Sequence, residues 1–230
     1  MIRFDAVSVV IPPVMKDDSE KVLLEGIDLE LGEQRVAVIG ANGSGKSTLL
    51  RLVNGMRRPT TGTVTVGGLD TVADAARVRA RVGFIFTDPL AQLLMSSPVE
   101  DIELSCKHLP RRERRAHALA LLAERGLEGL AHRSIYDLSG GERQLVALTS
   151  VLAVEPTVIV ADEPTTLLDL RNKVRLRRTL AELPQQILLS THDMEVAAEA
   201  ERVVVIDDGR VVADGEPAET IAWYERVMAT

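Results

Sequence analysis

One stretch of nine residues near the start of the chain constrains the fold more than any other. It fits G-x-x-x-x-G-K-[ST], the pattern of a phosphate-binding loop. Gly43 and Gly45 permit backbone turns that a residue with a Cβ resists. Such turns direct backbone N–H groups into a concavity that suits phosphate oxygens, and a following helix adds its positive dipole end. The nine residues are Gly40, Ala41, Asn42, Gly43, Ser44, Gly45, Lys46, Ser47 and Thr48.

The residues on either side of this loop supply the context that the motif requires. Residues 35–39 form a short apolar run typical of a buried strand, and residues 46–54 fit the helix that should follow. Lys46 can reach the β- and γ-phosphates, and Ser47 can offer its hydroxyl to Mg²⁺. A dinucleotide-binding loop is excluded because no third glycine follows Gly45. The alternative, a glycine loop that binds nothing, is disfavoured by this context.

Composition narrows the possible classes of protein. With 230 residues and 46% hydrophobic content, the chain can bury one sizeable core with a smaller lobe attached. A net charge of −7 argues against nucleic acid as a partner, and the single cysteine, Cys106, indicates a reducing compartment. The N-terminus lacks a signal-peptide pattern, and no apolar run approaches the ~18 residues of a membrane span. We therefore expect a soluble chain that other proteins must hold at any membrane.

The order of apolar runs predicts an α/β fold. A mostly parallel core sheet and an N-terminal antiparallel part should occupy about 1–87 and 156–230, with a helical insertion at about 88–155, all in a single domain, 1–230. A polar loop over 12–20 should join the first two strands. Strands are expected over 2–10, 22–31, 35–39, 63–66, 83–86, 158–160, 187–189, 203–206 and 211–212, and helices over 46–54, 100–107, 111–125, 142–153 and 219–228.

Two carboxylates at the end of the expected strand 158–160 form a second candidate site. Asp162 is placed to hold Mg²⁺, directly or through water. Glu163 could accept a proton from an attacking water or orient that water. Parallel sheets place ligands at the carboxyl ends of their strands, where the phosphate loop also lies. The alternative is a strand end capped by acidic loop residues.

Two further groups could contact phosphate. Ser139 can cap the helix that follows it, and Gly140 and Gly141 expose N–H groups at the N-terminus of that helix. Since the chain already has a phosphate loop, this second surface requires a nucleotide from elsewhere, most economically from a second subunit. His192, after the strand 187–189, could reach a γ-phosphate or the attacking water. The alternatives are an ordinary Ser-capped helix and a structural histidine.

Together these motifs resemble the nucleotide-binding subunit of ABC transporters over nearly the whole chain. The family order is kept in the Walker A, signature, Walker B, D-loop and switch-histidine motifs. The resemblance implies the P-loop ABC ATPase fold and a head-to-tail dimer that holds two ATP molecules between the Walker A of one subunit and the signature of the other. These motifs lie at 40–48, 138–142, 158–163, 168–169 and His192.

The resemblance also implies a role for each motif residue. Lys46 would contact phosphate, and Ser47 and Asp162 would hold Mg²⁺. Glu163 would act as the base and His192 as a γ-phosphate sensor. The D-loop residue Asp169 would communicate across the dimer.

Two departures from the family pattern are evident. Thr87 stands where the family usually has a glutamine that touches Mg²⁺, and Gln92 lies five residues further on without an assigned role. Residues 9–12 contain no aromatic side chain to stack on adenine, so weaker apolar contact, for instance from Ile11, would replace stacking. We therefore expect modest nucleotide affinity and loose discrimination between bases.

Residues 87–94 and 98–102 resemble segments of the ATPases of energy-coupling-factor (ECF) vitamin and metal importers, where they contact a transmembrane coupling protein. The resemblance implies an ATPase that powers uptake of a small solute, with the biotin branch preferred. Its partners would be a second ABC ATPase subunit, identical or related, a transmembrane coupling subunit and a substrate-binding membrane subunit. The protein would be cytoplasmic, on the inner face of the cell membrane.

Two other functions compete with this interpretation. A P-loop kinase of a small acceptor would explain the phosphate loop but gives no reason for the segment 138–142. A non-transport ABC ATPase of DNA repair or translation usually carries long insertions or two cassettes, and this acidic single cassette has neither.

Overall fold

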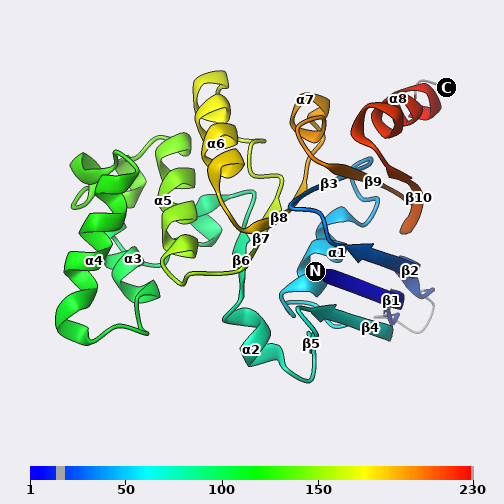
Figure 1. The fold of residues 1–230 in the computed structure, drawn as a ribbon, viewed down its shortest axis with the longest axis horizontal. Helices are drawn as coiled ribbons and strands as arrows, with labels where there is room; N and C mark the ends of the chain where they lie inside the picture. The colour runs from blue at the N-terminus through cyan, green and yellow to red at the C-terminus, as the bar shows by residue number, and fades with distance from the viewer. Residues whose placement is uncertain (14–18, 229–230) are drawn as a thin grey trace.

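The computed structural model describes residues 1–13 and 19–228. The polar loop expected over 12–20 therefore lies largely outside the described residues. Figure 1 shows two sheets at one end of the molecule and a group of helices at the other. Among the described residues, no helix is both long and apolar enough to cross a bilayer.

The core sheet has six strands in the order β10-β9-β3-β8-β7-β6. Every neighbouring pair is parallel except β9 and β10, so the expected mostly parallel core is confirmed. The parallel strands of this sheet are nearly continuous apolar runs, as expected for strands covered on both faces, whereas β10 alternates exposed and half-buried residues. The bounds are β3 (Arg35–Ile39), β6 (Val82–Ile85), β7 (Val158–Asp162), β8 (Gln186–Ser190), β9 (Arg202–Asp207) and β10 (Arg210–Gly215).

An antiparallel sheet of four strands in the order β2-β1-β4-β5 packs beside the core sheet. Its alternating apolar residues, such as Ile2 and Phe4, are buried in one cluster with α1. This confirms the expected N-terminal antiparallel part, although the short strand β5 was not predicted. The bounds are β1 (Ile2–Ile11), β2 (Lys21–Leu31), β4 (Thr61–Val66), β5 (Leu69–Asp70) and α1 (Lys46–Val53).

A helical lobe lies between β6 and β7 in the sequence and at one end of the molecule in space (Figure 1). Helices α3 and α5 each begin two residues before the predicted start, because Pro98 and the cap Ser139 are effective initiators. The lobe contains η1 (Pro89–Ala91), α3 (Pro98–Ser105), α4 (Arg111–Glu124), η2 (Glu128–Leu130), η3 (Ile135–Asp137) and α5 (Gly140–Leu152).

The remaining helices flank the sheets. The C-terminal helix was predicted, whereas the other three were not. They are α2 (Ala75–Arg79), α6 (Leu170–Glu182), α7 (Met194–Ala197) and α8 (Pro217–Met228).

A buried carboxylate ties the helical lobe together. Asp101 of α3 is 4% exposed, and its Oδ1 accepts hydrogen bonds from the backbone N–H groups of Leu94, at 2.7 Å, and Met95, at 3.1 Å. Its Oδ2 accepts a bond of 2.9 Å from Ser150 on α5. Charge-assisted bonds of this kind are stronger than neutral ones. Asp101 therefore fixes the segment before α3 against α5.

Candidate functional site

The phosphate loop connects β3 to α1 at the carboxyl end of the core sheet. Gly40, Gly43 and Gly45 have φ values of 148°, 83° and 116°, in the region that favours glycine. A Cβ on Gly40 would lie 2.1 Å from the carbonyl oxygen of Ile206. The backbone of the loop thus requires glycine for conformation and for space, as the motif predicted.

Lys46 is a buried cation at the first position of α1. It is 5% exposed, and its Nζ donates to the carbonyl oxygens of Gly40, at 2.8 Å, and Ala41, at 2.9 Å. Its Nζ also lies 3.7 Å from Glu163 Oε1. A buried ammonium needs such partners. The side chain therefore turns back along the inside of the loop, beside the Walker B glutamate.

Two strand ends and the first turn of α1 bring side-chain oxygens together. Asp162 is 3% exposed, and its Oδ1 accepts hydrogen bonds of 2.8 Å from both Ser47 Oγ and Ser190 Oγ. The parallel register of β7 and β8 places Asp162 directly beside Ser190. A carboxylate next to a hydroxyl is the oxygen donor set that Mg²⁺ prefers.

The chemistry of these residues fits Mg²⁺ bound together with a nucleotide. Among the described residues, no group of three or more His, Cys, Asp or Glu side chains could hold a metal ion by itself. Mg²⁺ is usually bound by one or two carboxylates together with substrate phosphates and water. Ser47 and Asp162 are the residues here that could hold an ion of this kind.

Glu163 has a strained backbone beside this oxygen pair. Its φ is 47°, and its N–H donates to Ser190 Oγ at 3.0 Å. Its Oε2 accepts a hydrogen bond from Thr166 at 3.0 Å and lies 3.2 Å from His192 Nδ1. Backbone strain of this kind often occurs at functional sites. The structure thus brings Lys46, Glu163 and His192 into one group.

The segment after β6 contacts the end of β7, next to Asp162. Thr87 Oγ1 donates to the backbone carbonyl of Asp162 at 2.7 Å. The Gln92 amide accepts from Phe86 N at 3.3 Å and donates to the Ala147 carbonyl at 3.2 Å. Thr87 therefore contacts the main chain of Walker B, whereas the Gln92 side chain connects β6 to α5.

The signature residues lie in the helical lobe and form local hydrogen bonds. Ser139 and Glu142 make a capping box, in which Glu142 Oε2 accepts from Ser139 N at 2.7 Å. These hydrogen bonds from Ser139 hold the pKa of the Glu142 carboxyl below its usual value. Gly140 begins α5, which Figure 1 places apart from α1 and its loop. The signature therefore lies apart from the phosphate loop of the same chain.

The D-loop packs directly on the signature helix. A Cβ on Gly141 would lie 2.1 Å from Cγ of Asn172. The carboxylate of Asp169 accepts hydrogen bonds from Asn172 N at 2.8 Å and from Asn172 Nδ2 at 3.1 Å. Asn172 thus links the D-loop to the start of α5, a contact that the sequence alone did not reveal.

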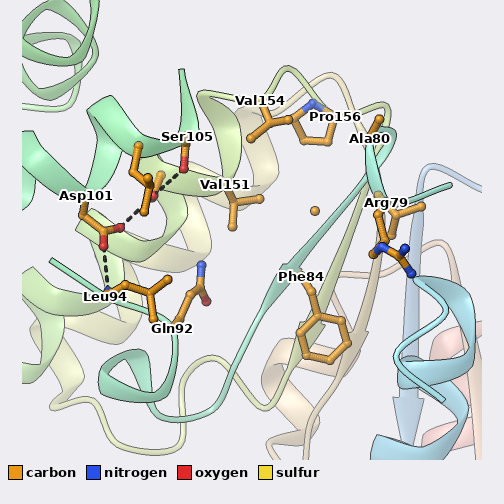
Figure 2. A pocket seen from close by; sticks show the side chains of 14 residues that line it. Arg79, Ala80, Phe84, Gln92, Leu94, Asp101, Ser105, Val151, Val154 and Pro156 are labelled. Carbon is orange, nitrogen blue, oxygen red and sulfur yellow. Dashed lines mark hydrogen bonds between the residues drawn. The ribbon is translucent and has the colours of Figure 1, made fainter. Parts of the chain in front are cut away.

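A groove of about 230 Å³ separates β6 from the helical lobe. Figure 2 shows Phe84, Val151 and Val154 beside it, with Leu94 at the edge next to Asp101. Leu94 is 77% exposed, although the backbone that carries it is fixed by Asp101. The exposed Leu94 therefore lies on a fixed backbone at the edge of a groove that has an apolar wall.

The sequence did not single out Ser190 or Thr166 as site residues. Ser190 follows an apolar strand like many structural serines, and its contact with Asp162 depends on β8 lying next to β7. Thr166 could not be recognised from the sequence, because its hydrogen bond to Glu163 depends on the turn that follows Glu163. The order of strands in a sheet is the information that the sequence lacked.

The chain is similar to the ATP-binding proteins of known transporters. The family model described as ABC transporter matches residues 24–166. The biotin transport ATP-binding protein BioM of Rhizobium etli is 44% identical over 211 residues, which cover 91% of this chain and 94% of BioM. The cobalt import ATP-binding protein CbiO of Syntrophus aciditrophicus is 38% identical over 208 residues, which cover 87% of this chain and 74% of CbiO.

A solved structure of an ATP-binding cassette has the same fold as this chain. The dimeric post-hydrolysis state of an ATP-binding cassette bound to ADP and Pi superposes with a TM-score of 0.82 at 28% identity. The match covers 94% of this chain and 99% of that cassette.

Ser190 provides a test of the site geometry. Ser190→Ala removes the bonds to Asp162 Oδ1 and to Glu163 N, so both carboxylates lose orientation. We expect nucleotide hydrolysis to fall by roughly 10–100-fold, with a higher Mg²⁺ requirement. Thr179→Ala, which removes a hydroxyl bonded within α6, is the control in the same assay. Equal rates in the two variants would contradict the assignment.

Proposed function

Because the chain belongs to the family of ABC transporter ATP-binding proteins, we propose that the residues around Asp162 cleave ATP at a site completed by a second subunit. The chain is an ATP-binding and ATP-hydrolysing subunit of an importer related to the vitamin and metal importers of the ECF class. The observation that carries the proposal is the meeting of Ser47, Asp162 and Glu163 beside the phosphate loop.

The phosphate loop and Lys46 would bind the phosphates. Backbone N–H groups of the loop and the dipole of α1 favour anions at this point. Lys46 Nζ, now on the carbonyls of Gly40 and Ala41, has the length and position to transfer its hydrogen bonds to phosphate oxygens. Ser47 and Asp162 would hold Mg²⁺, which neutralises charge on the phosphates when bound.

Glu163 would accept a proton from the attacking water or orient it. Its carboxylate lies between Lys46 Nζ and His192 Nδ1, which fixes where its oxygens point. His192 is about half exposed and would contact the γ-phosphate from the open side of the site. Hydrolysis would thus depend on two carboxylates with separate roles, Asp162 for the metal and Glu163 for the water.

The signature segment would complete the site of a second subunit. Ser139, Gly140 and Gly141 lie in the helical lobe, away from the phosphate loop of their own chain (Figure 1). A head-to-tail dimer would supply the missing half, and the similar cassette bound to ADP and Pi is dimeric. The D-loop around Asp169 would lie at the same interface, next to the exposed Leu170.

The groove beside Leu94 would receive a transmembrane coupling subunit. Its apolar wall and exposed leucine suit the apolar face of a helix from that subunit. A substrate-binding membrane subunit would complete an importer at the inner face of the cell membrane, with the ATPase in the cytoplasm. Biotin is the proposed solute, supported by the 44% identity to BioM, with a metal ion as the alternative supported by CbiO.

The composite site is tested with Glu163→Gln. This variant keeps the phosphate loop and the metal ligands but lacks the base, so we expect it to bind ATP and accumulate as a dimer with Mg-ATP. Light scattering after size-exclusion chromatography measures the mass. Adding Ser139→Arg should block closure without loss of ATP binding, and Lys46→Ala should lose nucleotide binding. A Glu163→Gln protein with undiminished turnover would refute the role of the base.

Docking at the groove is tested with Leu94→Glu. A charge at the groove edge should abolish co-purification of membrane subunits with the tagged chain, because burying it without a partner is costly. Val212→Glu, on the exposed strand β10, is the control and should still co-purify. Retention of the membrane subunits by Leu94→Glu would contradict the docking site.

A recovered complex that binds a metal ion but not biotin would exclude the biotin assignment.

A further inference from the structure

The turn between β9 and β10 contacts the phosphate loop. Gly209 N donates to the carbonyl oxygen of Ser44 at 2.9 Å. On its other side, the Gly209 carbonyl accepts a bond of 2.9 Å from Glu25 N on β2. The turn is thus hydrogen-bonded both to the loop and to the neighbouring sheet.

The turn and the loop rest on the same backbone carbonyl. A Cβ on Gly209 would lie 2.9 Å from Leu23 O, and a Cβ on Gly45 would lie at the same distance from that atom. Gly209 also has a φ of 75°, which L side chains rarely adopt. No other residue type fits this turn without displacing it from its close contact with Leu23 of β2.

The direction of the Ser44 carbonyl determines where the next N–H points. In a trans peptide the C=O of one residue and the N–H of the next lie in one plane and point in opposite directions. Because Gly209 holds the Ser44 carbonyl towards the turn, the N–H of Gly45 is directed away from the turn, into the loop.

We propose that Gly209 is a positioning residue for phosphate binding, which acts by fixing the Ser44–Gly45 peptide plane. This inference rests on the proposed phosphate role of the loop. Gly209 does not touch the nucleotide, and its effect passes through the backbone of Ser44. The turn from Asp208 to Gly209 therefore belongs to the nucleotide site, although it lies about 160 residues further along the chain.

Gly209→Ala tests the proposal against a closely matched control. Gly68 lies in the turn between β4 and β5 with a φ of 77°, and its added Cβ would meet no atom within 4 Å. Both substitutions place alanine at a positive φ, but only the Cβ added at Gly209 meets β2 and so displaces a turn that is hydrogen-bonded to the loop. We expect the Kd for ADP and the KM for ATP to rise by about tenfold or more in Gly209→Ala, with a smaller effect on kcat.

The control separates loss of nucleotide binding from loss of stability. Gly68→Ala should keep the wild-type Kd and KM, even if its thermal stability falls as much as that of Gly209→Ala. Equal Kd values in the two variants, with wild type binding ADP, would overturn the positioning role alone. A wild-type chain that binds no nucleotide would instead refute the proposed function.

A measurement on the wild-type chain covers the case in which Gly209→Ala does not fold. Amide hydrogen exchange of Gly209 reports on its bond to Ser44. If the turn and the loop are coupled, saturating ADP should slow exchange at Gly209 by about tenfold or more and leave Gly68 unchanged. Unchanged exchange at Gly209 in the ADP complex would overturn the proposal.

Discussion

Two hydrogen bonds to one carboxylate oxygen hold the site together. Ser47 and Ser190 both donate to Asp162 Oδ1 at 2.8 Å, so the start of α1 and the ends of β7 and β8 share one buried acceptor. Each residue reaches this point because parallel strands end at the same edge of the sheet. The phosphate loop, the proposed metal ligands and the strained Glu163 are all positioned around this contact.

The helical lobe contributes to two other proposed surfaces, the dimer interface at the signature and the groove beside Leu94. Helix α5 begins at the signature, and its far end carries Ser150, which bonds to Asp101 beneath the segment that presents Leu94. One rigid helix therefore extends from the proposed dimer interface to the proposed membrane-facing groove. Movement of this helix upon closure of the dimer would reach the groove without any contact between the groove and the nucleotide.

Local motifs were predictable from the sequence, whereas contacts between distant segments were not. The phosphate loop, the Asp162–Glu163 pair and the core strands were predicted because each has a local pattern. Helix α6 was missed because it is strongly charged and buries only Leu176 and Leu180, too narrow a stripe to recognise. Ser190 and Gly209 were missed because their roles depend on which strands and turns become neighbours.

Mn²⁺ can replace Mg²⁺ to test whether Ser47 and Asp162 together bind a nucleotide-bound cation. Electron paramagnetic resonance measures free Mn²⁺ during a titration of the chain in the presence of ADP. We expect tight Mn²⁺ binding that requires ADP and weakens by about tenfold or more in Asp162→Ala, with ADP held saturating. The same Mn²⁺ affinity in wild type and Asp162→Ala would contradict it.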